Sequence, residues 1–102
     1  MDIAFTSLFY RSYNALTESQ KEQINQAITR YCERPDPPYP SGWRVQKLHG
    51  VKGTTLDGEQ SPDIWEMHAP GPNALVVTFQ RDSEGNIMFR NCGLHDKTLR
   101  SP

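Results

Sequence analysis

The sequence predicts one α+β domain in which an N-terminal helical hairpin packs on a mainly antiparallel, twisted sheet of about four or five strands. Residues 5–32 carry apolar side chains at helical spacing. A proline-rich segment at residues 35–40 then interrupts the chain, and beyond Gly42 apolar and polar residues alternate as they do in strands. Helices gathered in one half of a chain and strands in the other are typical of an α+β domain.

The first half is predicted to hold a short strand, at residues 3–5, and two helices. The first helix follows Thr6, and its apolar spacing is set by Phe5, Leu8, Phe9, Tyr13 and Leu16. Thr17 and Gln20 match a capping box, which begins a second helix that Pro35 ends. The apolar face of this second helix consists of Ile24, Ala27, Ile28, Tyr31 and Cys32. Because almost no residues separate the two helices, we expect an antiparallel hairpin.

The second half is predicted to form strands at residues 43–48, 63–68, 74–80 and 87–92. Turns are expected at residues 70–73 and 82–86, a loop at 50–62, and a tail at 93–102. On the strand at 63–68, alternation places Trp65 and Met67 toward the core and Glu66 and His68 on the outward face. On the last strand, strict alternation would place Arg90 on the same face as Met88 and Cys92.

Composition limits the classes of function. The 102 residues match the size of a single domain, 1–102. The formal net charge is −1, so an RNA-binding site would have to be a local patch rather than a basic surface. No apolar run approaches the ~18 residues that cross a bilayer, and residues 1–5 do not read as a signal peptide, so we expect a cytoplasmic protein without a membrane partner. Cys32 and Cys92 lack CxxC spacing and are expected to be small buried residues.

Several local motifs occur in a characteristic order along the chain. Residues 5–7, Phe-Thr-Ser, precede an aromatic-rich helix, and residues 45–50 read x-x-K-L-x-G. Residues 63–67 read x-I-W-E-x, and the last strand runs into a histidine, His95. Together these motifs span essentially the whole chain. In this order they resemble those of the RelE/ParE toxin superfamily, and of its RelE-like branch in particular.

The resemblance implies a toxin of a type II toxin–antitoxin system with a cognate antitoxin as its partner. RelE-like members act on the ribosome, where they cut mRNA and arrest translation without a metal or other cofactor. His95 matches the family's C-terminal histidine, an acid or base, and Glu66, His68 and His49 are further catalytic candidates. The candidates for binding RNA phosphates are Lys47, Lys52, Arg81 and Arg90. The three histidines lack the paired spacing of zinc sites, so no metal is expected.

This interpretation depends on a curved sheet that gathers Lys47, Glu66, His68 and His95 into one concavity. Departures from the family pattern, among them the near-neutral charge, leave an alternative open. Residues 73–75, Asn-Ala-Leu, contain no cation where many RelE-like members have an arginine, and Gln46 stands where one branch has a catalytic glutamate. The alternative is a non-enzymatic ParE-like gyrase inhibitor, or a detoxified relative that acts by binding protein. For Glu66 alone, the alternative to a catalytic role is an exposed cross-strand charge partner.

Overall fold

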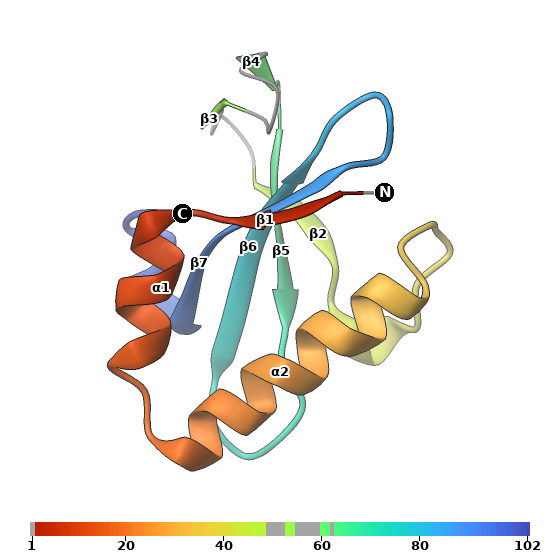
Figure 1. The fold of residues 1–102 in the computed structure, drawn as a ribbon. Helices are drawn as coiled ribbons and strands as arrows, with labels where there is room; N and C mark the ends of the chain where they lie inside the picture. Colours follow the sequence, from red (N-terminus) through yellow and green to blue (C-terminus); the bar gives the residue numbers. More distant parts are fainter. Residues whose placement is uncertain (1, 49–52, 55–59, 62) are drawn as a thin grey trace.

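A computed structural model describes residues 2–48, 53–54, 60–61 and 63–102. Its elements follow in chain order (Figure 1): β1 (Ile3–Phe5), α1 (Ser7–Asn14), α2 (Glu18–Glu33), the 3-10 turn η1 (Ser41–Trp43), β2 (Gln46–Leu48), β3 (Gly53–Thr54), β4 (Gln60–Ser61), β5 (Ile64–His68), β6 (Leu75–Arg81), β7 (Ile87–Leu94) and α3 (His95–Leu99).

Threonine caps begin both helices of the hairpin. The Thr6 hydroxyl accepts a hydrogen bond of 3.0 Å from the backbone N–H of Phe9 at the start of α1. At the start of α2, the Thr17 hydroxyl accepts from the Gln20 backbone, and the Gln20 side chain accepts from the Thr17 backbone. These bonds satisfy backbone donors that a helix leaves unpaired in its first turn. The predicted capping box is confirmed.

The main sheet has five strands in the order β1-β7-β6-β5-β2. β1 runs parallel to β7, and the other neighbouring pairs are antiparallel. β3 and β4 form a separate two-stranded pair within the predicted loop. The predicted α+β class, with a helical hairpin on a mainly antiparallel sheet, is confirmed.

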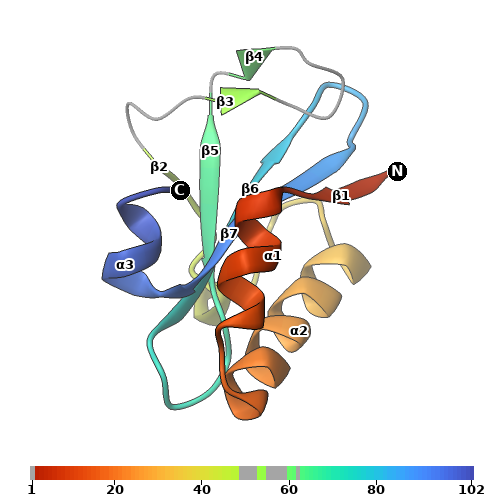
Figure 2. The same ribbon diagram turned by 60° about the vertical axis from the view of Figure 1, so that its left-hand side comes forward.

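The core lies between the helical hairpin and one face of the sheet (Figures 1 and 2). Ile24, Ala27 and Tyr31 of α2 are fully buried there, against alternate residues of the central strands. The strand residues of this core are Met67, Leu75, Val77, Phe79, Ile87, Phe89 and Cys92. The period of two places the intervening residues of β5 and β6 on the other face, here called the open face because the hairpin does not cover it. Val76, Thr78 and Gln80 are nevertheless fully buried there.

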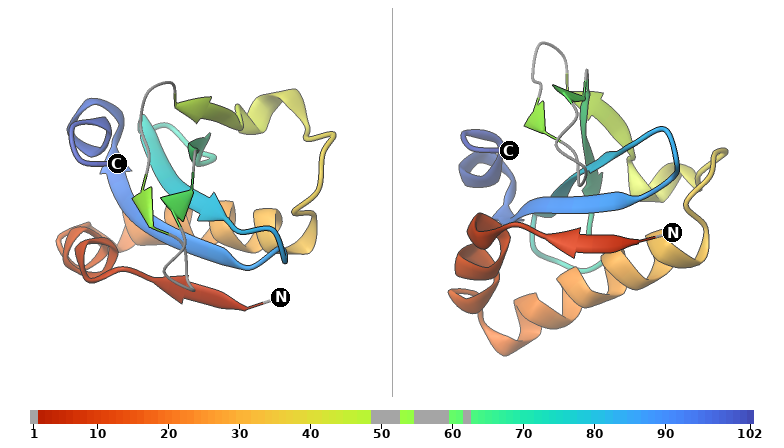
Figure 3. Two further views of the ribbon diagram at one scale, coloured as in Figure 1. Left: turned by 90° about the horizontal axis from the view of Figure 1, so that it is seen from above. Right: turned by 45° about the horizontal axis from the view of Figure 1, so that its top comes forward.

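The last ten residues depart from the prediction of a tail. β7 extends to Leu94, which pairs with Leu75, and the chain then turns into α3. Thr98 of α3 is buried, and its hydroxyl lies 3.1 Å from the position that a Cβ on Gly93 would occupy, so the strand and the helix meet closely there. Figure 3 shows α3 on the opposite side of β7 from α1. The prediction was wrong because five residues of helix are too short for a clear periodic pattern.

The prediction of which residues share a face on the last strand was wrong, because β7 contains a β-bulge. Thr78 pairs with Asn91 and Phe79 with Phe89, so Arg90 is an extra residue in β7. Past the bulge the alternation is reversed, and Cys92 lies in the core with Ile87 and Phe89 rather than beside Arg90. The strand predicted from residue 43 also begins later, because η1 occupies Ser41–Trp43.

Among the described residues, no helix is both long enough and apolar enough to cross a membrane.

Candidate functional site

Glu66 is a buried carboxylate in the middle of the sheet's open face. β5 lies between β2 and β6, and Glu66 is directly opposite Gln46 on one side and Thr78 on the other. The residue is 1% exposed, which corrects the expectation of an exposed cross-strand charge partner. The side-chain N–H of Gln46 donates a hydrogen bond to Glu66 Oε1, whereas Oε2 accepts no hydrogen bond from any described residue. The carboxylate is thus held by one oxygen and leaves the other available.

His95 approaches this available oxygen from the first turn of α3. Its backbone N–H donates to the Ala74 carbonyl at 2.9 Å, which fixes the start of α3 against the turn before β6. Nε2 of His95 lies 3.9 Å from Glu66 Oε2, and Nδ1 lies 3.0 Å from Asp96 Oδ1. The imidazole therefore stands between two carboxylates, and its side chain remains 36% exposed.

His68 completes a cluster of three titratable groups. It lies two residues after Glu66 on β5 and therefore on the same face, with its ring centroid 5.5 Å from that of His95. Burial lowers the pKa of His68 below 6.5, an effect that the Glu66 carboxylate opposes and that His95 and Arg44 reinforce. One side-chain donor atom each from Glu66, His68 and His95 lies within 4.8 Å of the other two. The sequence spacing did not indicate this potential ligand set, because α3 and β5 are far apart in the chain.

Beside the two histidines lies a cavity of about 620 Å³ that is open to solvent. Its walls are Arg44, His68, Ala74, Leu94, His95, Asp96, Lys97 and Arg100. Three of these residues are cations that no sequence pattern indicated: Arg44, Lys97 and Arg100. Lys97 and Arg100 are three residues apart, which places them on one face of a helix, a spacing that would have been informative had α3 been predicted.

Arg44 has no comparable sequence signal. It follows η1 in a left-handed backbone conformation with φ of 50°. The preceding Trp43 ring stacks on the guanidinium of Arg30, 5.0 Å from the ring centroid, and Arg30 in turn donates to the His68 carbonyl. Arg44 is therefore positioned by a tertiary contact between α2, β5 and η1.

Asn73, the first of the cation-free residues 73–75, has a structural role. Asn73 donates a 2.8 Å hydrogen bond to the Gln23 side chain, and Gln23 donates to the Pro70 carbonyl at 2.9 Å. Gly71, with φ of +118°, allows this close approach, because a Cβ there would lie 1.8 Å from the Gln23 amide nitrogen. These contacts fasten the β5–β6 turn to α2, while the cations of the cavity come from other segments.

Lys47 does not join the cluster. It pairs with Trp65 across the β2–β5 ladder, and its Nζ lies 3.8 Å from Asp63 Oδ1. Because Gln46 faces Glu66, the adjacent Lys47 points to the opposite face. The expected concavity of four residues is therefore corrected to three, without Lys47. His49 and Lys52 lie outside the described residues.

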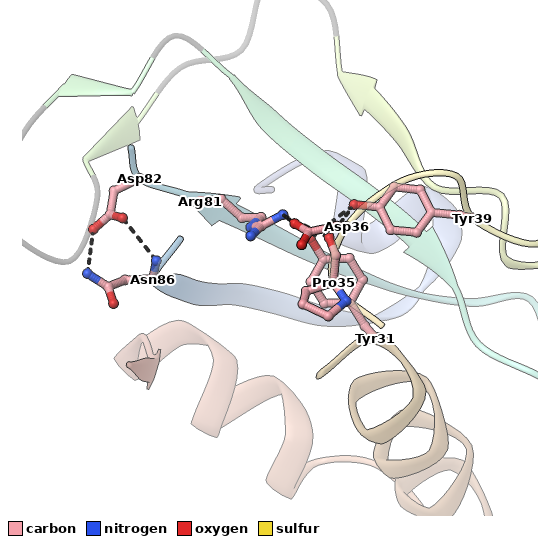
Figure 4. A network of polar contacts seen from close by, with 7 residues as sticks. All are labelled: Tyr31, Pro35, Asp36, Tyr39, Arg81, Asp82 and Asn86. Carbon is pink, nitrogen blue, oxygen red and sulfur yellow. Dashed lines mark hydrogen bonds and ion pairs between the residues drawn. The ribbon is translucent and has the colours of Figure 1, made fainter. Parts of the chain in front are cut away.

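Arg81 and Arg90 are both held by other parts of the protein. Arg81 donates to the Pro35 carbonyl at 2.8 Å and lies 3.2 Å from Asp36, next to Tyr31 and Tyr39 (Figure 4). Burial raises the pKa of the Tyr31 hydroxyl in this network. Arg90 donates to Gln80 Oε1 at 2.7 Å and to the Pro102 carbonyl at 3.1 Å. Neither arginine lines the cavity beside His95.

No family model matches the sequence, and no curated protein matches it. Among solved structures, a chain of the intact RelBE toxin–antitoxin complex from E. coli is similar, with a TM-score of 0.62. The fold is RelE-like. The two chains are 15% identical, and the match covers 92% of this chain and 95% of the other. The RelE-like fold thus accounts for nearly the full length of both chains.

Proposed function

We propose that this chain is the toxin of a type II toxin–antitoxin pair and that it cuts mRNA on the ribosome by acid–base catalysis. The observation that carries the proposal is the convergence of Glu66, His68 and His95 beside a cationic cavity on the open face of a RelE-like fold. The similar E. coli chain comes from a toxin–antitoxin complex, which supports the same class.

The proposed reaction is an internal transesterification of the RNA backbone. A base removes the proton of a 2′-hydroxyl, whose oxygen attacks the adjacent phosphorus. The bond from phosphorus to the 5′-oxygen breaks, and an acid protonates that oxygen, leaving a 2′,3′-cyclic phosphate and a 5′-hydroxyl. Two histidines in opposite protonation states perform these steps well near neutral pH.

The surroundings of the two imidazoles favour different roles. Burial lowers the pKa of His68, which keeps its ring neutral and able to accept the 2′-hydroxyl proton. His95 lies 3.9 Å from Glu66 Oε2 and 3.0 Å from Asp96 Oδ1, and its half-exposed ring lines the cavity, where it can donate a proton to the leaving oxygen. Glu66 is too deeply buried to meet RNA, so we assign it a positioning role between the two rings.

Arg44, Lys97 and Arg100 would hold the phosphates on either side of the cut and stabilise the charge that develops on the reacting phosphate. Phosphate contacts provide affinity and position but read no sequence. Any codon preference must therefore come from how the ribosome presents the message. A cognate antitoxin and a cytoplasmic location are parts of the same proposal.

The test is induction of the chain in a bacterial host without an antitoxin, followed by mapping of transcript ends. We expect growth arrest with cuts inside codons. His95→Ala and His68→Ala should each slow cleavage by purified protein and ribosomes by about 10²-fold or more. Lys21→Ala, a change on the far helix α2, serves as the control. Full growth, or arrest with intact transcripts and blocked DNA supercoiling, would contradict the proposal, and the second outcome would select the gyrase-inhibitor alternative.

A further inference from the structure

We propose that Glu66, His68 and His95 also form a binding site for a divalent transition-metal ion of the zinc type, and that the bound ion switches RNA cleavage off. Metal binding stands independently of the proposed function, whereas the inhibitory effect rests on it.

The donor set suits a borderline metal ion. Two imidazoles and one carboxylate are the ligands of three-residue zinc sites that leave a fourth position open. Imidazole nitrogens disfavour magnesium and calcium, which prefer oxygen. Around a tetrahedral zinc ion, donors ~2.1 Å from the metal lie about 3.4 Å apart. The three donors here lie within 4.8 Å of one another, so small side-chain rotations of His68 and His95 would close the site.

Two neighbouring residues, Asp96 and Gln46, orient the cluster in the way that outer residues orient the ligands of a metal ion. Asp96 Oδ1, 3.0 Å from Nδ1 of His95, favours the tautomer with the proton on Nδ1. That tautomer leaves the lone pair on Nε2, the nitrogen that faces Glu66. Gln46 likewise donates to Glu66 Oε1 and leaves Oε2 available. Carboxylate–histidine–metal arrangements of this kind are the usual second layer of zinc sites.

A further observation is that the buried Glu66 Oε2 has no hydrogen-bond donor among the described residues, although His95 Nε2 lies 3.9 Å away. The Glu66 side chain is 2% exposed, and Oε2 accepts no hydrogen bond from a described residue. A buried oxygen without a partner costs folding free energy, and such groups in native proteins usually have a functional reason. A metal ion would provide the missing partner.

The residues of the cavity determine how tightly the site should bind a metal ion and how binding should affect cleavage. Arg44, Lys97 and Arg100 lie in the same cavity and disfavour additional positive charge, so binding should be weaker than at a structural zinc site. A bound ion would occupy the nitrogen lone pairs of His68 and His95. Neither ring could then accept or donate the proton that RNA cleavage needs, so binding and cleavage exclude each other.

The binding test uses the purified full chain without RNA. Titration with Co²⁺, followed by its visible d–d absorption, and calorimetry with Zn²⁺ should both show one site per chain. Glu66→Gln and His95→Ala should each weaken binding at least tenfold, and Asp96→Asn about 10–100-fold, as changes in the outer layer do. Cys32→Ser, which removes a half-buried thiol elsewhere, should bind like the parent. Circular dichroism of each variant checks that it is folded.

Absence of binding, or equal binding by the parent, Glu66→Gln and His95→Ala, would overturn the metal site and leave the cleavage test untouched. If the chain cuts RNA, saturating Zn²⁺ should abolish cleavage and a zinc-selective chelator should restore it. Undiminished cleavage with the site filled would overturn the switch. An inactive chain that still binds metal through these residues would refute only the proposed function.

Discussion

The buried carboxylate of Glu66 connects the parts of the candidate site. Glu66 contacts Gln46 through one oxygen and lies 3.9 Å from His95 through the other, so it links the edge strand β2 to the terminal helix α3. Burial of an ionised carboxylate is costly unless polar partners compensate for it. Its effect on the neighbouring imidazoles is therefore the most direct way to test the site.

Replacement of Glu66 by Gln should lower the pKa of His68. The negative charge of Glu66 stabilises the protonated His68 ring and partly offsets the effect of burial. Removing that charge leaves burial, His95 and Arg44, all of which lower the pKa. An NMR titration of the His68 ring should therefore show its midpoint at lower pH in Glu66→Gln than in the parent. A midpoint that moves upward, or stays in place, would refute the proposed coupling.

His68 should also make stability depend on pH. Its pKa in the folded chain lies below the 6.5 of an unfolded histidine. Between these two pKa values the unfolded chain binds more protons, so the contribution to the free energy of unfolding is full above about pH 6.5 and is lost as pH falls through the folded pKa. Urea denaturation at pH 7.5 and pH 5 should show a larger loss for the parent than for His68→Gln. Equal losses would contradict the prediction.

At the scale of elements, the helical hairpin depends on its caps. Thr17→Ala removes the hydroxyl that accepts from the Gln20 backbone and leaves that donor without its partner. We expect the free energy of unfolding to fall by about 1 kcal/mol, as is usual for the loss of a threonine N-cap. Thr29→Ala, at an exposed position inside α2, is the matched control and should change stability by only a few tenths of a kcal/mol. Urea denaturation measures both, and equal losses would argue against the capping role.

Arg81 connects the end of β6 to the segment after α2 (Figure 4). Arg81→Met should lower the free energy of unfolding by about 1–2 kcal/mol, because the Pro35 carbonyl loses a charged donor. Asp36 is mostly exposed, so Asp36→Asn should cost at most about 0.5–1 kcal/mol. Cleavage by the folded Arg81→Met variant should match the parent. If the variant instead loses cleavage without losing stability, Arg81 binds RNA phosphate, as predicted from the sequence.

The elements that the sequence predicted are those with strong local patterns. The α1–α2 hairpin has periodic apolar faces and the Thr17 cap, and β5 has clear alternation that placed Glu66 and His68 together correctly. Three features depend on tertiary contacts instead. The bulge at Arg90 shifts the alternation of β7, packing against Gly93 stabilises the short α3, and the Arg30–Trp43 contact positions Arg44. The histidine and glutamate of the site were therefore predictable, but its cations were not.

At the scale of the whole molecule, charge is balanced overall and concentrated locally. The chain has 11 basic and 12 acidic residues, so no long-range attraction draws it to RNA. Arg44, Lys97 and Arg100 nonetheless share one cavity with the two histidines. RNA affinity should therefore come from a few local contacts, and its salt dependence should report their number.

For three phosphate contacts with single-stranded RNA, the logarithm of the association constant should fall with the logarithm of salt concentration with a slope of about −2. Lys97→Ala should make this slope shallower by about 0.7, because the variant makes one phosphate contact fewer and therefore releases fewer counterions from the RNA. Lys21, which pairs with Glu18 on α2, lies outside the cavity, and Lys21→Ala should leave the slope unchanged. Fluorescence anisotropy with a short labelled RNA at several KCl concentrations measures all three proteins. If both lysine variants change the slope equally, RNA is attracted by charge spread over the whole surface. That result would refute the proposal that the cavity binds the RNA phosphates.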